Sequence, residues 1–212
     1  TLQQPPPNSE DYWDMLFTHT WEARRGRDQT IFFANVALDH FPDWFKEEIH
    51  AHAYSICDAG CALGDGVDVL TKAFPTTKVT GVDFSEEAIN KAKQYYPSYT
   101  FAVADVLQMT DQYDIIFSSN TLEHFHDPFP ILHKLLQQSN KYLVLLLPFQ
   151  DDTGTYEHFF RFDYEHFPEK IDDFRLIFLK EINCRLMANT HWHAKQILAI
   201  YRKKEGEMWN DI

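Results

Sequence analysis

The stretch CDAGCALGDG, residues 57–66, decides how the fold is interpreted. It holds three glycines and two acidic residues, and it follows a short apolar run. A glycine-rich turn between a strand and a helix is a common nucleotide-binding element, because bare backbone amides at the helix start face the ligand. The neighbouring residues have to show which nucleotide this turn suits, or whether it is only a surface loop.

The turn lacks the residues that bind a diphosphate. Counted from Gly60, the dinucleotide pattern G-x-G-x-x-G meets Ala62 and Asp65 where it requires glycines. No Gly-Lys-Ser/Thr of a P-loop follows either. Asp58, Asp65 and Asp68 bring negative charge to the turn, and this charge would repel phosphates. We therefore expect a ligand that carries positive charge.

The length and the cysteines indicate one intracellular domain. A chain of 212 residues can bury a sizeable single core. Its three cysteines are an odd number without a C-x-x-C pair, so we expect neither a disulfide framework nor a zinc site. No apolar run approaches the ~20 residues of a membrane span, and the start has no signal-peptide pattern. These features favour a cytoplasmic protein that does not enter a membrane.

The formal net charge of −13 argues against a nucleic-acid partner, since phosphate binding needs clustered Lys and Arg. One basic cluster, Arg24-Arg25-Gly26-Arg27, stands against this background. It is either a solvated helix end or a dock for an anionic group of a substrate.

Strands and helices alternate through the middle of the chain, which predicts a parallel sheet with helices on both faces. Residues 1–49 contain a Pro-rich leader and helical patterns between 9 and 45, which we interpret as a lid or cap over a substrate. Residues 50–212 form the main domain, with an insertion for the acceptor at about 150–172. The expected strands are 54–58, 78–83, 100–105, 113–120, 141–149, 174–182 and 195–203, and the expected helices between them are 66–74, 85–96 and 129–139. The last two strands form an antiparallel pair.

Polar residues recur where the expected parallel strands end. Asp58 and Gly60 follow the first strand, Asp83 closes the second, Asp105 the third and Asn120 the fourth. Ligands of open parallel sheets bind beyond these carboxyl ends. One acid in such a place is common as a turn residue or helix cap, but three in succession indicate a binding site.

These segments resemble the ordered motifs of class I S-adenosylmethionine-dependent methyltransferases. DAGCALGDG is similar to the first motif, D/E-x-G-x-G-x-G, and departs from it at Ala62. VTGVDFSEEAINKA resembles the second motif and FAVADVLQM the third. YDIIFSSNTLEHFHDP is similar to the segment of the fourth strand. The resemblance covers roughly residues 50–203.

The resemblance implies a Rossmann-like α/β three-layer sandwich, with a seven-stranded, mostly parallel sheet that ends in the antiparallel pair. It implies S-adenosyl-L-methionine as cofactor and S-adenosyl-L-homocysteine as product. This cofactor carries an ammonium and a sulfonium but no phosphate, which suits an acidic turn. Asp83 takes the ribose-binding position and Asp105 lies near the adenine. The expected cofactor-binding residues are Asp58, Gly60, Cys61, Ala62, Gly64, Asp83, Phe84, Asp105, Val106 and Asn120.

The acceptor site is expected in the aromatic stretch after Pro148. His158 is the first candidate for a general base, because the unperturbed pKa of histidine suits that task, and His124 and His126 compete with it. Glu157 and Asp163 are candidates to orient His158. Arg24, Arg161 and His166 are the expected substrate-binding residues. Tyr156, Phe159, Phe160 and Phe162 either wall a pocket or belong to the core.

We expect no metal site, because the pairs Asp151-Asp152 and Asp172-Asp173 have no spaced histidine or third carboxylate of clear geometry. The favoured function is O-methylation of a small molecule or of a sugar or glycan precursor. One alternative is a non-catalytic S-adenosylmethionine-binding or regulatory module, which Ala62 in the glycine turn would support. Another is a protein or nucleic-acid methyltransferase, which the acidic charge disfavours.

Overall fold

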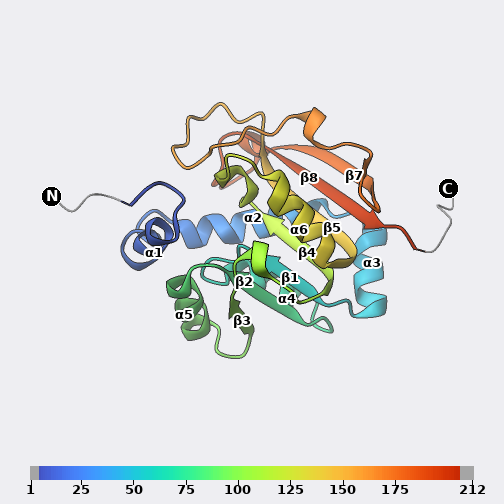
Figure 1. The fold of residues 1–212 in the computed structure, drawn as a ribbon, viewed down its shortest axis with the longest axis horizontal. Coiled ribbons are helices and arrows are strands. Elements are labelled where there is room, and N and C mark those ends of the chain that lie inside the picture. Colours follow the sequence, from blue (N-terminus) through green and yellow to red (C-terminus); the bar gives the residue numbers. More distant parts are fainter. Residues whose placement is uncertain (1–4, 206–212) are drawn as a thin grey trace.

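The computed structural model describes residues 5–205, and it contains an eight-stranded sheet in the order β3-β2-β1-β4-β5-β8-β7-β6. In Figure 1 the strands follow one another from β3 at the bottom to β7 at the top. The strands are β1 (Ile56–Ala59), β2 (Val79–Asp83), β3 (Thr100–Val103), β4 (Tyr113–Ser119), β5 (Ser139–Phe149), β6 (Lys170–Ile171), β7 (Phe174–Asn183) and β8 (Lys195–Lys203). The helices are α1 (Glu10–His19), α2 (Gly26–His40), α3 (Asp43–His52), α4 (Asp65–Ala73), α5 (Glu86–Tyr95) and α6 (Phe129–Gln138). Four short 3-10 turns are η1 (Val106–Gln108), η2 (Leu122–His124), η3 (Tyr164–His166) and η4 (Cys184–Leu186).

The sheet confirms the predicted class. Strands β1 to β5 pair in parallel, and β8 runs antiparallel between β5 and β7. The strand count is eight rather than seven because Lys170–Ile171 folds back on the start of β7 through a two-residue turn at Asp172 and Asp173. A two-residue strand carries no periodic pattern, so sequence reasoning does not detect it.

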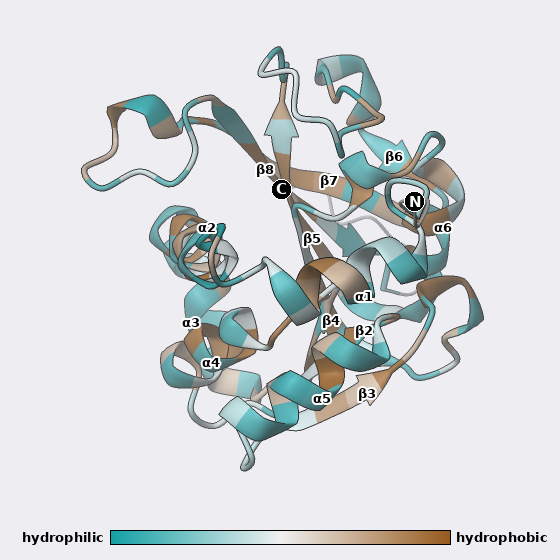
Figure 2. Ribbon diagram, turned by 90° about the vertical axis from the view of Figure 1, so that its left-hand side faces the viewer, coloured by the Kyte–Doolittle hydropathy of each residue, from teal (hydrophilic) through white to brown (hydrophobic). Residues whose placement is uncertain are grey.

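The sheet has two buried faces, as β5 shows. Tyr142, Val144 and Leu146 pack into one core cluster, and the intervening Leu143, Leu145 and Leu147 pack into the other. Successive side chains of a strand point to opposite faces, so a continuous apolar run requires cover on both. Figure 2 shows α2, α3 and α4 on one side of β4 and β5, and α6 on the other. The predicted three-layer sandwich is confirmed.

Local capping explains where the helices begin. The Ser9 hydroxyl accepts from the Tyr12 amide at 3.2 Å and caps α1. The Ser85 hydroxyl accepts from the Ala88 amide at 3.0 Å and caps α5, as its position before two glutamates predicted. Helix α4 starts after Gly64, whose φ of 83° lies in the left-handed region that glycine adopts without strain.

The N-terminal helices divide between two tasks. Phe33 and Val36 of α2, and Phe45 and Ile49 of α3, belong to the core cluster beneath the sheet. Helix α1 instead packs on α5, at the edge where the parallel strands end. Helix α1 has the position of the predicted lid, α2 packs on the sheet and also lines the cavity described below, and α3 completes the sandwich. The role of residues 1–49 as a lid stays a prediction. The boundary at residues 49 and 50 stays a prediction, and residues 1–4 of the predicted leader lie outside the described part.

Candidate functional site

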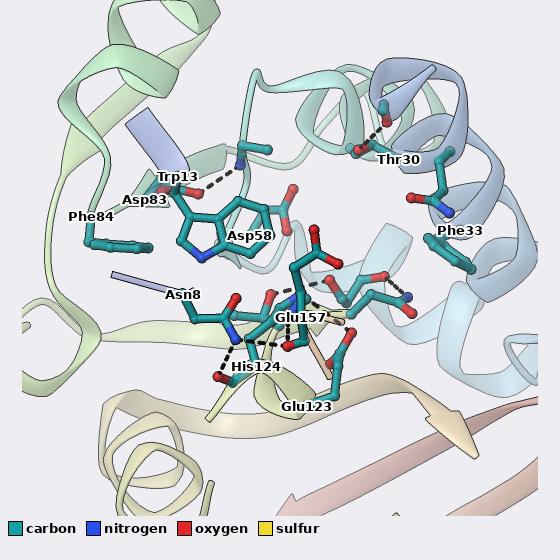
Figure 3. A pocket seen from close by; sticks show the side chains of 18 of the residues that line it. Asn8, Trp13, Thr30, Phe33, Asp58, Asp83, Phe84, Glu123, His124 and Glu157 are labelled. Carbon is teal, nitrogen blue, oxygen red and sulfur yellow. Dashed lines mark hydrogen bonds and ion pairs between the residues drawn. The ribbon is translucent and has the colours of Figure 1, made fainter. Parts of the chain in front are cut away.

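A cavity of about 570 Å³ lies beyond the carboxyl ends of β1, β2 and β4. This is where the strand order reverses between β1 and β4, the usual ligand crevice of an open parallel sheet. Figure 3 shows Asp58, Asp83 and Phe84 on one side of it, and Glu123 and His124 on the other. The lining comes from α1, α2, the turn after β1, the end of β2, η1, the segment after β4, residues 155–158 and Trp192.

The glycine-rich turn has backbone conformations that explain its composition. Gly60 has a φ of 84°, and a Cβ there would lie 2.4 Å from Thr121 Oγ1. A Cβ at Gly64 would lie 2.6 Å from the Phe101 ring. Both positions therefore need glycine for the backbone angle and for the close approach of a neighbour. Gly64 packs against the sheet and does not line the cavity.

Ala62 is also left-handed, with a φ of 46°. This conformation costs an L-residue with a Cβ roughly 1–2 kcal/mol, which explains the glycine of the resembled motif at this position. The Ala62 amide donates to Asp83 Oδ2 at 2.9 Å. The turn after β1 is thus attached to the end of β2, and Ala62 keeps its place in the cavity wall.

Asp83 is buried and serves as a backbone acceptor. Besides the Ala62 amide, the Ser85 amide donates to its Oδ1 at 3.0 Å. Burial raises the pKa of Asp83 to about 6, although the backbone donors partly oppose this. Each carboxylate oxygen retains a second lone pair for a ligand hydroxyl.

Asp58 has neither an ion-pair partner nor a side-chain hydrogen bond among the described residues. It lies over the first turn of α4, where a Cβ at Gly66 would stand 2.7 Å from its Oδ2. Burial and the nearby charge of Asp83 raise the pKa of Asp58 to about 7. A cationic ligand group would favour its ionised form.

The other two acids of the turn do not face the ligand. Asp65 accepts a bidentate pair from Arg27, with Nη2 at 2.8 Å from Oδ1 and Nε at 3.2 Å from Oδ2, and a hydrogen bond from the Tyr96 hydroxyl. Asp68 pairs with Lys72 at 2.7 Å. Of the three acids that argued against phosphate, only Asp58 lines the cavity. A tertiary ion pair with Arg27 of α2 neutralises Asp65, and an i,i+4 pair within α4 neutralises Asp68.

The remaining predicted cofactor residues divide by position. Phe84, Asp105, Val106 and Asn120 line the cavity. Asp105 is exposed and caps η1 by accepting from the Leu107 amide at 2.9 Å. Cys61 does not line the cavity, because its buried thiol points toward Gly81 inside the sheet.

Two of the three candidate bases, His124 and His158, line the cavity and present their rings edge to face, 5.3 Å apart. His126 stacks on Phe159 outside the lining. His124 Nδ1 bonds the Glu157 carbonyl at 2.9 Å. His158 Nδ1 bonds Asp151 Oδ2 at 2.6 Å. Asp151 therefore orients His158, in place of the predicted Glu157 and Asp163. The Glu157 carboxylate instead accepts from the Tyr12 hydroxyl and Arg24.

Glu123 is a site residue that sequence reasoning missed. Its carboxylate is 1% exposed and has no hydrogen-bond partner among the described residues. Burial raises its pKa to about 8, while burial lowers the pKa of His124 to about 4 against the opposing backbone carbonyls of Glu157 and Asn120. The Glu123 carbonyl accepts from the amides of Phe159 and Phe160, which attaches the segment after β5 to η2.

The predicted substrate residues are not gathered in one place. Arg24 lines the cavity but is paired with Glu157 at 3.1 Å. Arg161 pairs with Asp152 and Asp163 outside the cavity lining. The His166 ring accepts from the Asp163 amide and packs on the side of α6, also outside the lining. Acceptor binding by Arg161 and His166 stays a prediction that the position of these residues does not support.

The aromatic wall of the cavity comes from other residues than those proposed from the sequence. Tyr156 is 68% exposed, and Phe162 is buried in the core below α6. The aromatic wall is instead formed by Trp13, Phe17, Trp21, Phe33, Phe84, Phe117, Phe125 and Trp192. Trp13 of α1 meets the His124 ring edge to face at 4.9 Å. The aromatic spacing in α1 was visible in the sequence, but it did not show which way the helix faces.

Known proteins share this sequence pattern and architecture. A family model described as a methyltransferase domain matches residues 50–153. Trans-aconitate 2-methyltransferase of Enterobacter sp. (strain 638) is 26% identical over 148 residues, which are 69% of this chain and 54% of that protein. The protein of the same name from Yersinia pseudotuberculosis serotype O:1b is also 26% identical, over 53% of its length. The chain thus spans about half the length of these curated relatives.

Solved structures agree at the level of the fold. Magnesium protoporphyrin IX methyltransferase from Synechocystis PCC 6803, with bound S-adenosylmethionine, superimposes with a TM-score of 0.62 at 18% identity, over 95% of this chain and 100% of that one. A plantazolicin methyltransferase with bound S-adenosylhomocysteine gives 0.65 at 16% identity, over 91% and 94% of the two chains. These matches and the strand-end residues described above together support a class I S-adenosylmethionine-dependent methyltransferase.

Proposed function

We propose that this protein transfers the methyl group of S-adenosylmethionine to an oxygen of a small molecule. The observation that carries this proposal is that one cavity joins the buried carboxylates Asp58 and Asp83 to the ring edges of His124 and His158. Methyl transfer is an in-line displacement, so its catalysis depends on holding the acceptor next to the sulfonium. A cavity with a cofactor side and an acid-base side meets that requirement.

The cofactor side suits the charges of S-adenosylmethionine. We assign the ribose hydroxyls to the free lone pairs of Asp83, and the ammonium of the methionine portion to Asp58. The adenine then lies at η1, where Asp105 accepts from its amino group and Val106 flanks the ring. This placement puts the sulfonium, which links the ribose to the methionine portion, near the middle of the cavity.

On the acceptor side we assign proton acceptance to His158. A carboxylate accepts but cannot donate, so the bond to Asp151 places the proton of His158 on Nδ1. Nε2 of the neutral ring then presents a lone pair to the acceptor hydroxyl. Burial lowers the pKa of His124 to about 4, so its ring is a poor proton acceptor near neutral pH.

The acceptor class follows from the lining. Arg24 is the only cationic residue among the lining residues described, and its side chain is 52% exposed despite its pair with Glu157. Tryptophan and phenylalanine rings supply most of the wall on the α1 side. Both features support a small, partly apolar acceptor with one anionic group. The curated relatives are named for a carboxylic acid substrate, and a sugar or glycan precursor with an acidic group fits as well.

Turnover and cofactor binding are tested separately. Purified protein is incubated with S-adenosylmethionine and a panel of hydroxylated or carboxylated small molecules, and S-adenosylhomocysteine is quantified. His158→Ala is expected to lower kcat by about 10²–10⁴ with little change in cofactor affinity. His133→Ala, on an exposed face of α6, is the matched control. Equal turnover of wild type and His158→Ala would remove His158 from the mechanism.

The alternative of a non-catalytic S-adenosylmethionine-binding module has one observation in its favour, the left-handed Ala62. Titration calorimetry with S-adenosylmethionine distinguishes the two. The module would be favoured if the wild type binds S-adenosylmethionine tightly, Asp83→Ala abolishes this binding, and no acceptor is turned over. Unchanged affinity in Asp83→Ala would reject the cofactor placement itself.

A cytoplasmic location without a nucleic-acid partner belongs to the same proposal. Cys57, Cys61 and Cys184 are all buried free thiols, as a reducing compartment permits. Within the described part of the chain, no helix combines the length and the apolar character that crossing a bilayer requires.

A further inference from the structure

We propose that Glu123, His124 and His158 form a binding site for a divalent transition-metal ion such as Zn²⁺. One potential ligand atom of each residue lies within 4.8 Å of the other two. The residues come from η2 and from the segment after β5, far apart in the sequence, which is why no spacing motif indicated them. The inference does not depend on the proposed function, because ion binding is measurable without any methyl acceptor.

The two imidazole rings are oriented as metal-bound histidines usually are. His124 Nδ1 bonds the Glu157 carbonyl, and His158 Nδ1 bonds Asp151. Both partners only accept, so in each neutral ring the proton is on Nδ1 and the lone pair is on Nε2. The Asp151 carboxylate is itself positioned by the Thr153 amide at 2.9 Å. Such an outer partner is the usual support of a histidine ligand.

The Glu123 carboxylate completes a set of acceptors that contains no donor. Both of its oxygens are buried and lack a hydrogen-bond partner among the described residues, although buried polar groups are normally satisfied. Its Oε1 lies 3.8 Å from His124 Nε2 and 3.9 Å from His158 Nε2. Two nitrogen lone pairs and a carboxylate that face one another form a set of ligands that a metal cation between them would satisfy.

The distances from Glu123 Oε1 to the two histidine Nε2 atoms are too long for direct hydrogen bonds and suit a small ion between them. Two ligand atoms that each lie about 2.1 Å from Zn²⁺ at a tetrahedral angle stand about 3.4 Å apart. The observed Glu123–histidine distances exceed this by a few tenths of an ångström, which small side-chain rotations can remove. Imidazole nitrogens favour Zn²⁺, Fe²⁺ or Ni²⁺ over Mg²⁺, which prefers oxygen ligands.

The ion would have an open position toward the cavity, since all three residues are part of its lining. Three protein ligands and one free position are typical of catalytic rather than structural zinc. A hydroxyl that coordinates there would have a lowered pKa. A bound ion would occupy the Nε2 lone pair with which His158 would otherwise accept a proton. His158 therefore cannot be a metal ligand and a general base at the same time. Turnover measured with and without the ion shows which of the two roles operates.

Binding is tested on the full chain after treatment with a chelator and dialysis. Titration calorimetry with ZnCl₂ is expected to give one site per chain, and MgCl₂ no comparable heat. Glu123→Gln keeps the shape of the side chain, and His124→Asn keeps a donor for the Glu157 carbonyl while it removes Nε2. Each substitution is expected to weaken Zn²⁺ binding more than about tenfold, because losing even an outer partner costs 10–100-fold.

His133→Gln controls for adventitious binding by surface histidines, since His133 pairs with Asp172 on the outside of α6. It is expected to bind Zn²⁺ like the wild type. Zn²⁺ should also raise the melting temperature of the wild type but not of Glu123→Gln, and melting without Zn²⁺ shows that each variant folds. Wild type that binds no Zn²⁺, Glu123→Gln and His124→Asn that both bind it normally, or Mg²⁺ that binds equally well would each overturn the proposal.

Discussion

The pKa of Asp58 makes cofactor binding dependent on pH. We expect S-adenosylmethionine to bind the ionised form, because its ammonium needs a charged partner in a buried place. In the ligand-free protein the pKa of Asp58 is raised to about 7 by burial and by Asp83. No nearby positive charge lowers this pKa again. Asp83 is itself acidic, and Arg27 is already paired with Asp65.

The magnitude follows from the fraction of ionised protein. At pH 6, one unit below the pKa, about a tenth of Asp58 is ionised, and at pH 8 about nine tenths. The apparent Kd scales with the inverse of the competent fraction, so affinity should rise about tenfold from pH 6 to pH 8. Asp83, with a pKa of about 6, adds about a factor of two at the lower pH.

Stability without the cofactor should change in the opposite direction. A carboxyl group with a raised folded-state pKa stabilises the fold fully below its unfolded pKa of about 3.9. That stabilisation is lost as the pH rises through about 7. Asp58→Asn should therefore raise the free energy of unfolding at pH 8, by at most about 4 kcal/mol for a pKa that folding raises by about three.

The assay is titration calorimetry at pH 6, 7 and 8, in two buffers of different ionisation enthalpy to count released protons, with urea denaturation in parallel. Asp58→Asn should bind the cofactor weakly and with a smaller pH dependence. Asp68→Asn is the control, because Asp68 lies in the same turn but pairs with Lys72. Affinity that is flat between pH 6 and 8 in the wild type would refute the assignment of the ammonium to Asp58.

Two further substitutions test the neighbourhood of the cavity. Ala62→Gly removes the Cβ from a residue in the left-handed conformation and is expected to stabilise the fold by about 1 kcal/mol. Calorimetry should show this as a rise of roughly 2–4 °C in Tm. A fall in Tm would show that the lost methyl contacts outweigh the relief of strain. Arg27→Met leaves Asp65 buried and unpaired, and should cost about 3 kcal/mol in urea denaturation, whereas Arg25→Met should cost less than about 1 because its pair with Asp28 is exposed. Equal effects of the two arginine substitutions would contradict this difference.

Local sequence patterns were enough to predict the sheet and its cofactor edge. Apolar runs of strand length marked β1 to β5, and the carboxyl ends of parallel strands necessarily meet at one edge. The order of the strands along the chain was therefore sufficient to place Asp58, Asp83 and Asn120 together. Ser85 was predicted as a cap for the same local reason. The two-residue β6 was missed because it is too short to have a period.

The acceptor side and the electrostatics of the turn depend instead on tertiary contacts. Glu123 and His158 meet because backbone bonds attach the segment after β5 to η2, and the path of an irregular segment has no period that a sequence displays. Arg27 reaches Asp65 only because α2 packs on α4. Side-chain pairing across such contacts depends on positions in space rather than spacing along the chain. The tertiary pair of Arg27 with Asp65 and the local i,i+4 pair of Lys72 with Asp68 leave Asp58 as the one uncompensated acid. The tertiary contacts also place three potential metal ligands in one cavity.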